Sequence, residues 1–193
     1  MTEPGTDPRR RMVIGAADMI RRRGISATSV RDLAKHAHAP LGSTYHYFPG
    51  GKQQLAAEAV RFAGDTVSRI LTRELAAGPV AGLRAFLAVW RHTVLSTDFR
   101  AGCPVLAVAV EEPSGEQHAA VDAAAEVFAA WELLLADALR RHGAADAEAS
   151  RLATLTVAAV EGSVAMCRAK RDIRPLDDVA ACLETLLTAA VTT

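Results

Sequence analysis

Cysteines are few in this 193-residue chain, and long apolar runs are absent. The three cysteines, Cys103, Cys167 and Cys182, form no Cys-x-x-Cys pair and are too few for a disulfide framework, so we expect reduced thiols. The N-terminus carries arginines but no apolar segment of the kind found in signal peptides. The longest apolar runs, such as 105–110, are far shorter than the roughly 20 residues of a membrane span. These absences favour a cytoplasmic protein without membrane contact.

Residues that favour β-strands are also scarce. Aromatic residues make up 5% of the chain, whereas hydrophobic residues make up 50%, and many of those are alanine. Alanine is the best helix former and is depleted in strands. The composition therefore predicts an all-α fold, and the length permits a small domain joined to a larger one.

The net charge is zero, but the charges are unevenly distributed. Residues 1–52 carry nine basic and four acidic side chains, a net charge of +5, which leaves −5 on the remainder. A basic N-terminal part on an acidic body suggests that only the N-terminal part contacts a polyanion such as nucleic acid. A solvated face with no partner would give the same pattern.

Apolar residues spaced at i, i+3, i+4 and i+7, together with Pro and Gly boundaries, predict nine helices. A Thr28 N-cap is expected to open the second helix, and Pro40 the third. The predicted helices run over about 8–23, 28–37, 40–48, 52–77, 79–96, 104–112, 115–142, 146–170 and 175–191. The first three match the outline of a helix-turn-helix, which predicts a DNA-binding domain at 1–51, with 1–7 disordered, and a helical domain at 52–193.

The segment 28–55 resembles the TetR family of bacterial regulators. The family pattern is matched by Thr28, Ala34, Ala37, Gly42, Ser43, Tyr45, Tyr47, Phe48 and Lys52. Further similarity to the branch of the LmrA and QdoR/YxaF repressors lies in Ala39-Pro40, 48–52, 102–105, Glu161-Gly162, Arg168 and Arg171. His38 departs from the usual turn glycine, and Leu41 from the basic or polar residue common in the branch.

The resemblance and the helix-turn-helix geometry together identify DNA-contact candidates. The N-terminal part of the third helix is expected at the base edges of the major groove, with phosphate contacts around it. The candidates are Thr28, Ser29, Pro40, Leu41, Gly42, Ser43, Thr44, Tyr45, His46 and Lys52. Gly42 would serve close backbone approach or packing, Tyr47 and Phe48 are expected in the core, and Arg9–Arg11 would be either a DNA-contacting or a solvated disordered arm.

The C-terminal part is expected to bind a small ligand and to dimerise, as the resemblance implies. The predicted pocket holds aromatic and apolar side chains with a few polar groups, and no Arg or Lys cluster. Its candidates are Phe86, Trp90, Thr93, Cys103, Leu106, Val110, Phe128, Trp131, Glu161 and Met166. The dimer-interface candidates on the last two helices are Leu152, Leu155, Ala159, Gly162, Leu183, Leu186 and Leu187, although these stripes could face the monomer's own core. The ligand is expected to be hydrophobic and flavonoid- or drug-like.

The partners implied are a double-stranded operator, a small-molecule inducer and a second copy of the chain, with no cofactor and no metal. A repressor is the main prediction, and an activator would share every one of these features. An enzyme would need Cys103 as nucleophile with His92 or His118 as base, a weak set without a supporting carboxamide or carboxylate. The three histidines His36, His38 and His46 lack the spacing of a metal site.

Overall fold

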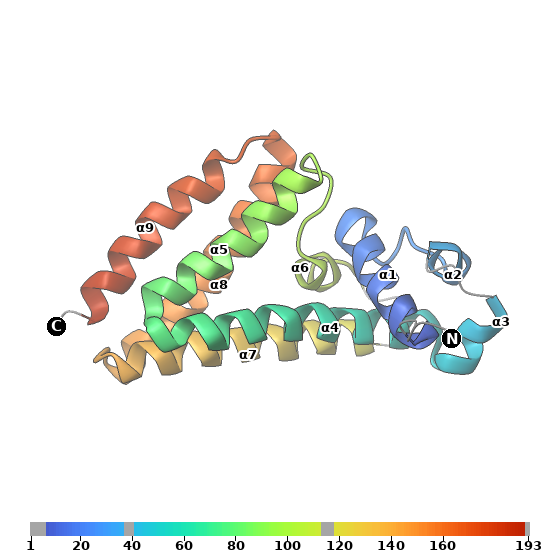
Figure 1. Ribbon diagram of the computed structural model, residues 1–193, viewed down its shortest axis with the longest axis horizontal. Coiled ribbons are helices and arrows are strands. Elements are labelled where there is room, and N and C mark those ends of the chain that lie inside the picture. The colour runs from blue at the N-terminus through green and yellow to red at the C-terminus, as the bar shows by residue number, and fades with distance from the viewer. Residues whose placement is uncertain (1–6, 37–40, 113–117, 192–193) are drawn as a thin grey trace, which may run out of the picture. The chain divides into compact units, whose positions relative to one another are not determined.

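The computed structural model describes residues 7–36, 41–112 and 118–191, and these residues form α-helices without any strand. In chain order the helices are α1 (Pro8–Arg23), α2 (Val30–His36), α3 (Leu41–Tyr47), α4 (Gly51–Glu74), the 3₁₀ turn η1 (Leu75–Ala77), α5 (Pro79–Ser96), α6 (Pro104–Ala109), α7 (Ala119–Arg141), α8 (Asp146–Lys170) and α9 (Arg174–Val191) (Figure 1). The all-α prediction with nine α-helices is confirmed for the described part of the chain.

The chain forms two compact units, each assembled from segments distant in sequence. The first unit comprises Met1–Gly64 and Pro104–Glu126, and the second comprises Asp65–Cys103 and Val127–Thr193. Helix α6 and the beginning of α7 therefore belong with the N-terminal helices. The functional division of the chain after residue 51 remains a prediction.

Helix α1 begins and ends where its sequence predicts. The Asp7 carboxylate accepts a hydrogen bond from the backbone N–H of Arg9 (3.1 Å), and Pro8 occupies the first turn, where no N–H is needed. Three arginines lie in the last turn, where cations offset the helix dipole. Gly24, at φ +78°, ends the helix and donates its N–H to the Ile20 carbonyl (2.8 Å). Arg9–Arg11 are thus part of α1, which corrects their interpretation as a disordered arm.

Helix α2 is capped by Ser29, not by Thr28 as the sequence suggested. The Ser29 hydroxyl accepts from the Asp32 N–H (3.1 Å), and the Asp32 carboxylate accepts from the Ser29 hydroxyl and N–H, which completes a reciprocal capping box. These hydrogen bonds, led by the one from the Ser29 hydroxyl, lower the pKa of Asp32. Thr28 is buried, and its hydroxyl donates to the Gly24 carbonyl (2.7 Å). Thr28 and Ser29 both carry a hydroxyl that could cap the helix. Because Thr28 is buried and bonded elsewhere, Ser29 is the cap.

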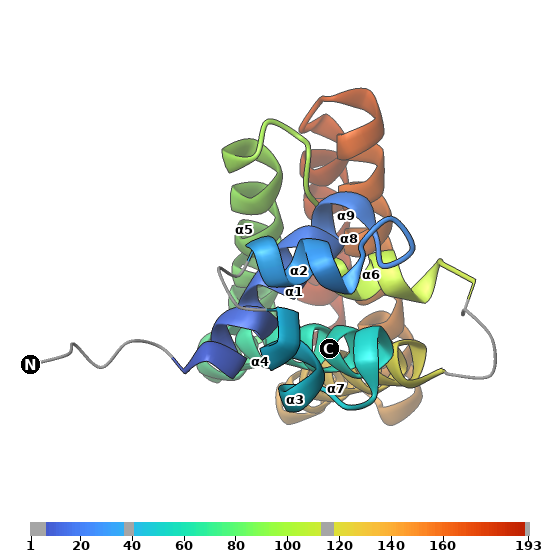
Figure 2. The same cartoon turned by 90° about the vertical axis from the view of Figure 1, so that its right-hand side faces the viewer.

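The first unit packs α1 against α2, α3 and α6 (Figure 2). Its core side chains are predominantly aliphatic, and Phe48, directly after α3, is fully buried as predicted. Full burial of each such side chain stabilises the fold by about 1.5–3 kcal/mol. Other buried members of this core are Met12, Ala16, Ile20, Leu33, Leu55, Val60, Val105, Val108 and Ala123.

The second unit is a bundle in which α9 packs against α8 and α5. The largest fully buried side chains are Leu71, Leu75, Leu83, Phe86, Trp131, Leu135, Leu139 and Leu176. By length and composition alone, α8 could cross a membrane, and half of its most apolar window is buried inside the protein. Its packing between α5 and α9 is that of a core helix in a bundle.

Several helix ends differ from the predicted ones by a few residues. Helix α4 begins at Gly51 and ends at Glu74, after which 75–77 tighten into the 3₁₀ turn. Helix α7 is described from Ala119 to Arg141, and α9 begins at Arg174 with Pro175 as its second residue. Pro40, the predicted start of α3, lies outside the described residues.

Candidate DNA-binding site and ligand-binding region

The helix-turn-helix of the first unit consists of α2 and α3, which pack on each other and on α1. Of the predicted base-contacting residues, Pro40 lies outside the described residues, and for Leu41, Ser43 and Thr44 only the backbone is described. Gly42 lies in α3, and a Cβ added there would meet no described atom within 4 Å. A packing role for this glycine therefore has no support, and the surface beside it is open.

The C-terminal half of α3 presents exposed polar and aromatic groups. Tyr45 is 58% exposed and His46 is exposed, whereas Tyr47 is half-buried with its ring 5.4 Å from that of His46. The phenol and imidazole carry donors that suit phosphate oxygens. Two of the predicted phosphate contacts thus lie on the surface of the same short helix.

Lys52, the third predicted phosphate contact, is partly engaged within the protein. Its Nζ donates to the Ile25 carbonyl at 3.2 Å, and the side chain is half-buried at the start of α4. An ammonium group has three donors, so this bond leaves two for a phosphate. The lysine can hold the α1–α2 turn and contact DNA together.

Thr28 and Ser29 differ in accessibility. Thr28 is 1% exposed and its hydroxyl is already bonded, so its side chain is not placed to reach a phosphate, contrary to the prediction. Ser29 is exposed at the N-terminus of α2, where backbone N–H groups favour an anion. The sequence could not separate these neighbours because both are good caps.

Basic residues of the first unit also form internal ion pairs. Arg9 pairs with Glu58 (2.7 Å), and its guanidinium carbon lies 5.1 Å from the Phe48 ring centre. Asp18 binds Arg21 and Arg22 and lies 3.3 Å from His36. Burial alone would raise the pKa of Asp18, but the hydrogen bonds from the two arginines outweigh it and lower the pKa. Part of the basic charge is therefore neutralised at the surface.

In the second unit, four of the predicted ligand residues form one aromatic cluster. Ring centres lie 5.4 Å apart for Phe86 and Trp131, 6.1 Å for Phe86 and Trp90, 6.2 Å for the two tryptophans, and 5.8 Å for Phe128 and Trp131, all in edge-to-face geometry. Phe86, Trp90 and Trp131 are buried, and Phe128 is half-buried. The tertiary structure thus assembles side chains from α5 and α7 that the sequence identified only one by one.

Glu161 is a buried acid on α8. Its side chain is 3% exposed, and burial raises its pKa to about 8, an effect opposed more weakly by the adjacent Cys103 thiol. Neither carboxylate oxygen has a hydrogen-bond partner of standard geometry among the described residues. The same holds for the Trp90 indole N–H and for the Thr156 hydroxyl, which sequence reasoning missed because a threonine in a helix is unremarkable.

The segment before α6 runs along α8 beside this acid. A Cβ on Gly102 would lie 3.4 Å from Val164 Cγ1 and 2.9 Å from Arg168 Cδ, and Arg168 donates to the Arg100 carbonyl (3.4 Å). The close approach permitted by Gly102 brings Cys103 next to Glu161. Gly102 and Cys103, from one segment that carries the branch resemblance, therefore lie against Glu161 and Arg168 from the other.

The remaining ligand candidates are scattered. Thr93 is half-buried, with its hydroxyl bonded to the Val89 carbonyl of its own helix (2.9 Å), and Leu106 is half-buried in the first unit. Val110 is 73% exposed and Met166 is 47% exposed. Their assignment to an inner helix face was wrong, because Val110 follows the end of α6 and Met166 lies on the outer side of α8.

The dimer candidates split between two faces. Leu183 and Leu187 are buried in the second unit, whereas Leu155 and Leu186 are 45% and 43% exposed. Gly162 is exposed with nothing within 4 Å of an added Cβ, and Leu152 and Ala159 are half-buried. The stripes therefore supply both the monomer core and an exposed, apolar outer face.

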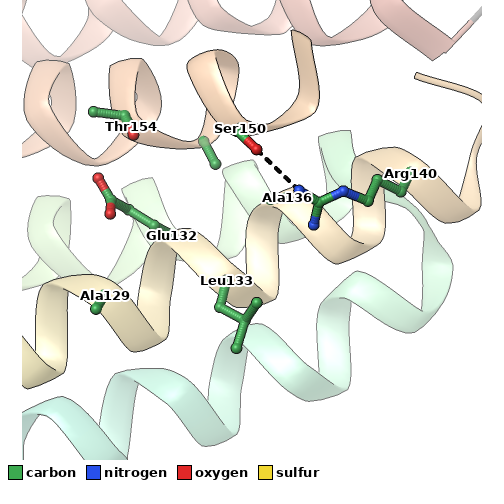
Figure 3. A pocket seen from close by; sticks show the side chains of 8 residues that line it. Ala129, Glu132, Leu133, Ala136, Arg140, Ser150 and Thr154 are labelled. Atoms are coloured by element: carbon green, nitrogen blue, oxygen red, sulfur yellow. Dashed lines mark hydrogen bonds between the residues drawn. The ribbon is translucent and has the colours of Figure 1, made fainter. Parts of the chain in front are cut away.

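A groove of about 240 Å³ lies between α7 and α8 of the second unit (Figure 3). Arg140 crosses it to donate to the Ser150 hydroxyl (2.9 Å), and Glu132 points toward Thr154. None of the predicted ligand residues lines it. Within the described residues no group of three His, Cys, Asp or Glu side chains could hold a metal ion, and both His92 and His118 are exposed.

Comparisons with known proteins agree with this arrangement. Residues 14–59 match the model of bacterial regulatory proteins of the tetR family, and residues 79–182 match the C-terminal domain of LmrA/YxaF-like transcriptional regulators. The chain is 45% identical over 186 residues to the uncharacterized HTH-type transcriptional regulator Rv0196 of Mycobacterium tuberculosis, covering 94% of this chain and 95% of that protein. It is 30% identical over 178 residues to the uncharacterized HTH-type regulator YxaF of Bacillus subtilis, covering 91% and 92%.

A crystal structure of a TetR transcriptional regulator from Legionella pneumophila has the same fold, with a TM-score of 0.82 at 18% identity over 94% of this chain and 98% of that one. The helix order, the helix-turn-helix and the two family models agree. The chain belongs to the TetR family of bacterial transcriptional regulators, in its LmrA/YxaF-like branch.

Proposed function

We propose that this protein is a transcriptional repressor that leaves a near-palindromic operator when a small, largely apolar and aromatic ligand binds. The observation that carries the proposal is the match of residues 14–59 to the tetR family model, which covers most of α1, all of α2 and α3, and the start of α4. The exposure of Tyr45 and His46 on α3 supports it, because a recognition helix needs an open face. We place such a protein in the cytoplasm.

In this proposal α3 enters the major groove with its N-terminal end at the base edges. Pro40 and Leu41 offer only apolar contacts, for example to thymine methyl groups, while Ser43 and Thr44 offer hydroxyls. None of them makes the bidentate pairing that Arg or Asn gives, so direct readout is modest. Phosphate contacts from Tyr45, His46 and Lys52 supply most of the affinity.

The ligand is proposed to bind in the second unit, near the aromatic cluster. The Trp90 N–H and the Glu161 carboxyl support this, because neither has a hydrogen-bond partner of standard geometry among the described residues and buried polar groups normally have one. With its pKa near 8, Glu161 is mainly protonated at neutral pH and can donate to a neutral ligand as well as accept from it. A neutral aromatic molecule fits these groups, and a tight inducer carrying several charges would contradict the assignment.

The proposed dimer uses the exposed face of α8 and α9 that includes Leu155, Gly162 and Leu186. Homodimers of this family place two recognition helices about one DNA turn, or roughly 34 Å, apart, so the operator repeats its half-site in inverted order. Ligand binding then favours a conformer in which the two α3 helices no longer match that spacing. A complete reversal of the equilibrium requires about 5.5 kcal/mol of differential affinity.

The test is in vitro selection of duplexes from a random pool with the purified protein, followed by footprinting on promoters adjacent to its gene. We expect inverted repeats, and a reporter under the footprinted promoter should rise when the gene is deleted. A fall on deletion would make the protein an activator. A protein that selects no duplex at low ionic strength would overturn the proposal.

A further inference from the structure

The turn between α1 and α2 is held by an acid from the far end of α6. The Glu111 carboxylate accepts hydrogen bonds from two consecutive backbone N–H groups, those of Ile25 (2.8 Å) and Ser26 (2.7 Å). These N–H groups follow the end of α1 and have no helical partner there. Hydrogen bonds to an ionised group are shorter and stronger than those between neutral groups.

The lack of a side chain at Gly24 leaves room for this carboxylate. A Cβ at this position would lie 1.9 Å from Glu111 Oε1, far inside any permitted contact. Its φ of +78° is also one that side chains disfavour. The turn and the acid therefore fit each other only because residue 24 is glycine.

The same turn is held from its other side. The Ile25 carbonyl accepts from Lys52 Nζ (3.2 Å) and from the Thr28 N–H (3.1 Å), so both polar groups of the Ile25 backbone are engaged. Ile25 is itself buried, and it shares a narrow crevice with Gln53, Val108 and Glu111. Helix α2 starts only four residues after Ser26, so the clamp fixes the point from which the helix-turn-helix begins.

We infer that Glu111 is a positioning residue for operator binding, although it lies outside the helix-turn-helix and 85 residues from Ser26 in sequence. The inference rests on the proposed DNA-binding function. A carboxylate in a basic DNA-binding unit repels phosphates, so its charge alone weakens DNA binding. Its clamp on the turn acts in the opposite direction by holding α2 and α3 in one orientation.

The two roles predict opposite signs for the same substitution. If Glu111 acts only through its charge, Glu111→Gln tightens binding to every duplex at low salt. If it positions the turn, Glu111→Gln weakens binding to the selected duplex, because the amide has one oxygen acceptor and sets its NH₂ against the second N–H. Glu112→Gln is the matched control, since it removes the same charge from the next, exposed residue.

The experiment measures fluorescence anisotropy of full-length protein on a duplex obtained by in vitro selection and on an unrelated duplex of equal length. We expect Glu111→Gln to bind the selected duplex roughly tenfold more weakly, which matches the loss of one charge-assisted hydrogen bond. Binding to the unrelated duplex should not weaken. The amides of Ile25 and Ser26 should exchange faster with D₂O by NMR in Glu111→Gln and not in Glu112→Gln.

Gly24→Ala provides an independent variant, because its methyl group displaces the carboxylate without removing it. We expect the same loss of selected-duplex affinity, and little further loss in the Gly24→Ala/Glu111→Gln double variant. Unchanged or tighter binding by Glu111→Gln, or unchanged exchange at both amides, would overturn the inference. A parent protein that selects no duplex would instead refute the proposed function, while the exchange data would still report on the clamp.

Discussion

The two compact units differ in how completely their polar groups are hydrogen-bonded. In the first unit the α1–α2 turn is held by hydrogen bonds, with Glu111 on the N–H groups of Ile25 and Ser26 and Lys52 on the Ile25 carbonyl. All the buried side-chain nitrogen and oxygen atoms that lack a hydrogen-bond partner of standard geometry among the described residues, those of Trp90, Thr156 and Glu161, lie in the second unit.

An unpartnered buried polar group costs about 1–3 kcal/mol, so a fold keeps it where a ligand or a water can satisfy it. Under the proposed function the two units would therefore have different tasks. The first would hold a fixed shape for a rigid duplex, and the second would keep polar groups that a bound molecule completes. Four substitutions test this contrast.

The largest effect is expected from Trp131→Ala in the second unit. Trp131 is fully buried and contacts three other aromatic rings, so its removal should lower the free energy of unfolding by about 3–5 kcal/mol. Urea denaturation at fixed protein concentration measures this. Leu133→Ala, at a 60% exposed position of the same helix, should change it by less than about 0.5 kcal/mol. Equal losses in both variants would show that the cluster is not the centre of this core.

Glu161→Gln should make the free energy of unfolding less dependent on pH. The pKa of Glu161 is about 8 in the folded protein and near its ordinary value of 4.5 when unfolded, so the unfolded chain releases the proton first. Its stabilising contribution is complete below about pH 4.5 and is lost as pH rises through 8. Between pH 6 and pH 8 the free energy of unfolding of the parent should fall by about 2–3 kcal/mol, whereas that of Glu161→Gln should not.

The measurement is urea denaturation at several pH values. The exposed Glu148→Gln on the same helix controls for loss of a carboxylate and should keep the parent's slope. Identical slopes in the parent and Glu161→Gln would mean that the acid is hydrated or paired in solution, and the contrast between the units would fail at its main residue.

Lys52→Ala tests the role of the first unit in this contrast. It removes the proposed phosphate contact and the bond to the Ile25 carbonyl, so the affinities for selected and unrelated duplexes should both fall, by roughly tenfold for the selected one. The slope of log K against log salt should become shallower by about 0.9. Anisotropy titrations between about 50 and 200 mM salt measure both, with the exposed Arg73→Ala as a charge-matched control. A parent-like salt slope would remove Lys52 from the phosphate contacts.

Ser29→Ala should give the smallest effect. It breaks the capping box with Asp32 and should reduce the free energy of unfolding by about 1 kcal/mol. Ser26→Ala, whose backbone N–H rather than its side chain is engaged by Glu111, should leave stability unchanged. Thermal denaturation of both variants measures the difference, and a parent-like melting temperature for Ser29→Ala would show that its hydroxyl does not stabilise α2.

Much of the fold follows from local chemistry that a sequence displays. Pro8, Gly24, Pro79 and Asp146 mark helix ends within one or two residues, because caps and breakers act on their immediate neighbours. The family motif around Gly42 and Tyr45 likewise identifies the recognition helix from the residue pattern alone. The sequence does not show which of two adjacent capping residues is used, or which leucine of an apolar stripe is buried. Both depend on what packs against the helix.

By itself, then, the sequence determined the helical class, several of the helix boundaries and the family. Only the tertiary structure decided that Glu111 clamps Ile25 and Ser26, and that Glu161 lies buried beside Cys103. These contacts join residues 58 to 86 positions apart in the chain. No local propensity records such a pair, because the partners meet only once distant parts of the chain have packed together.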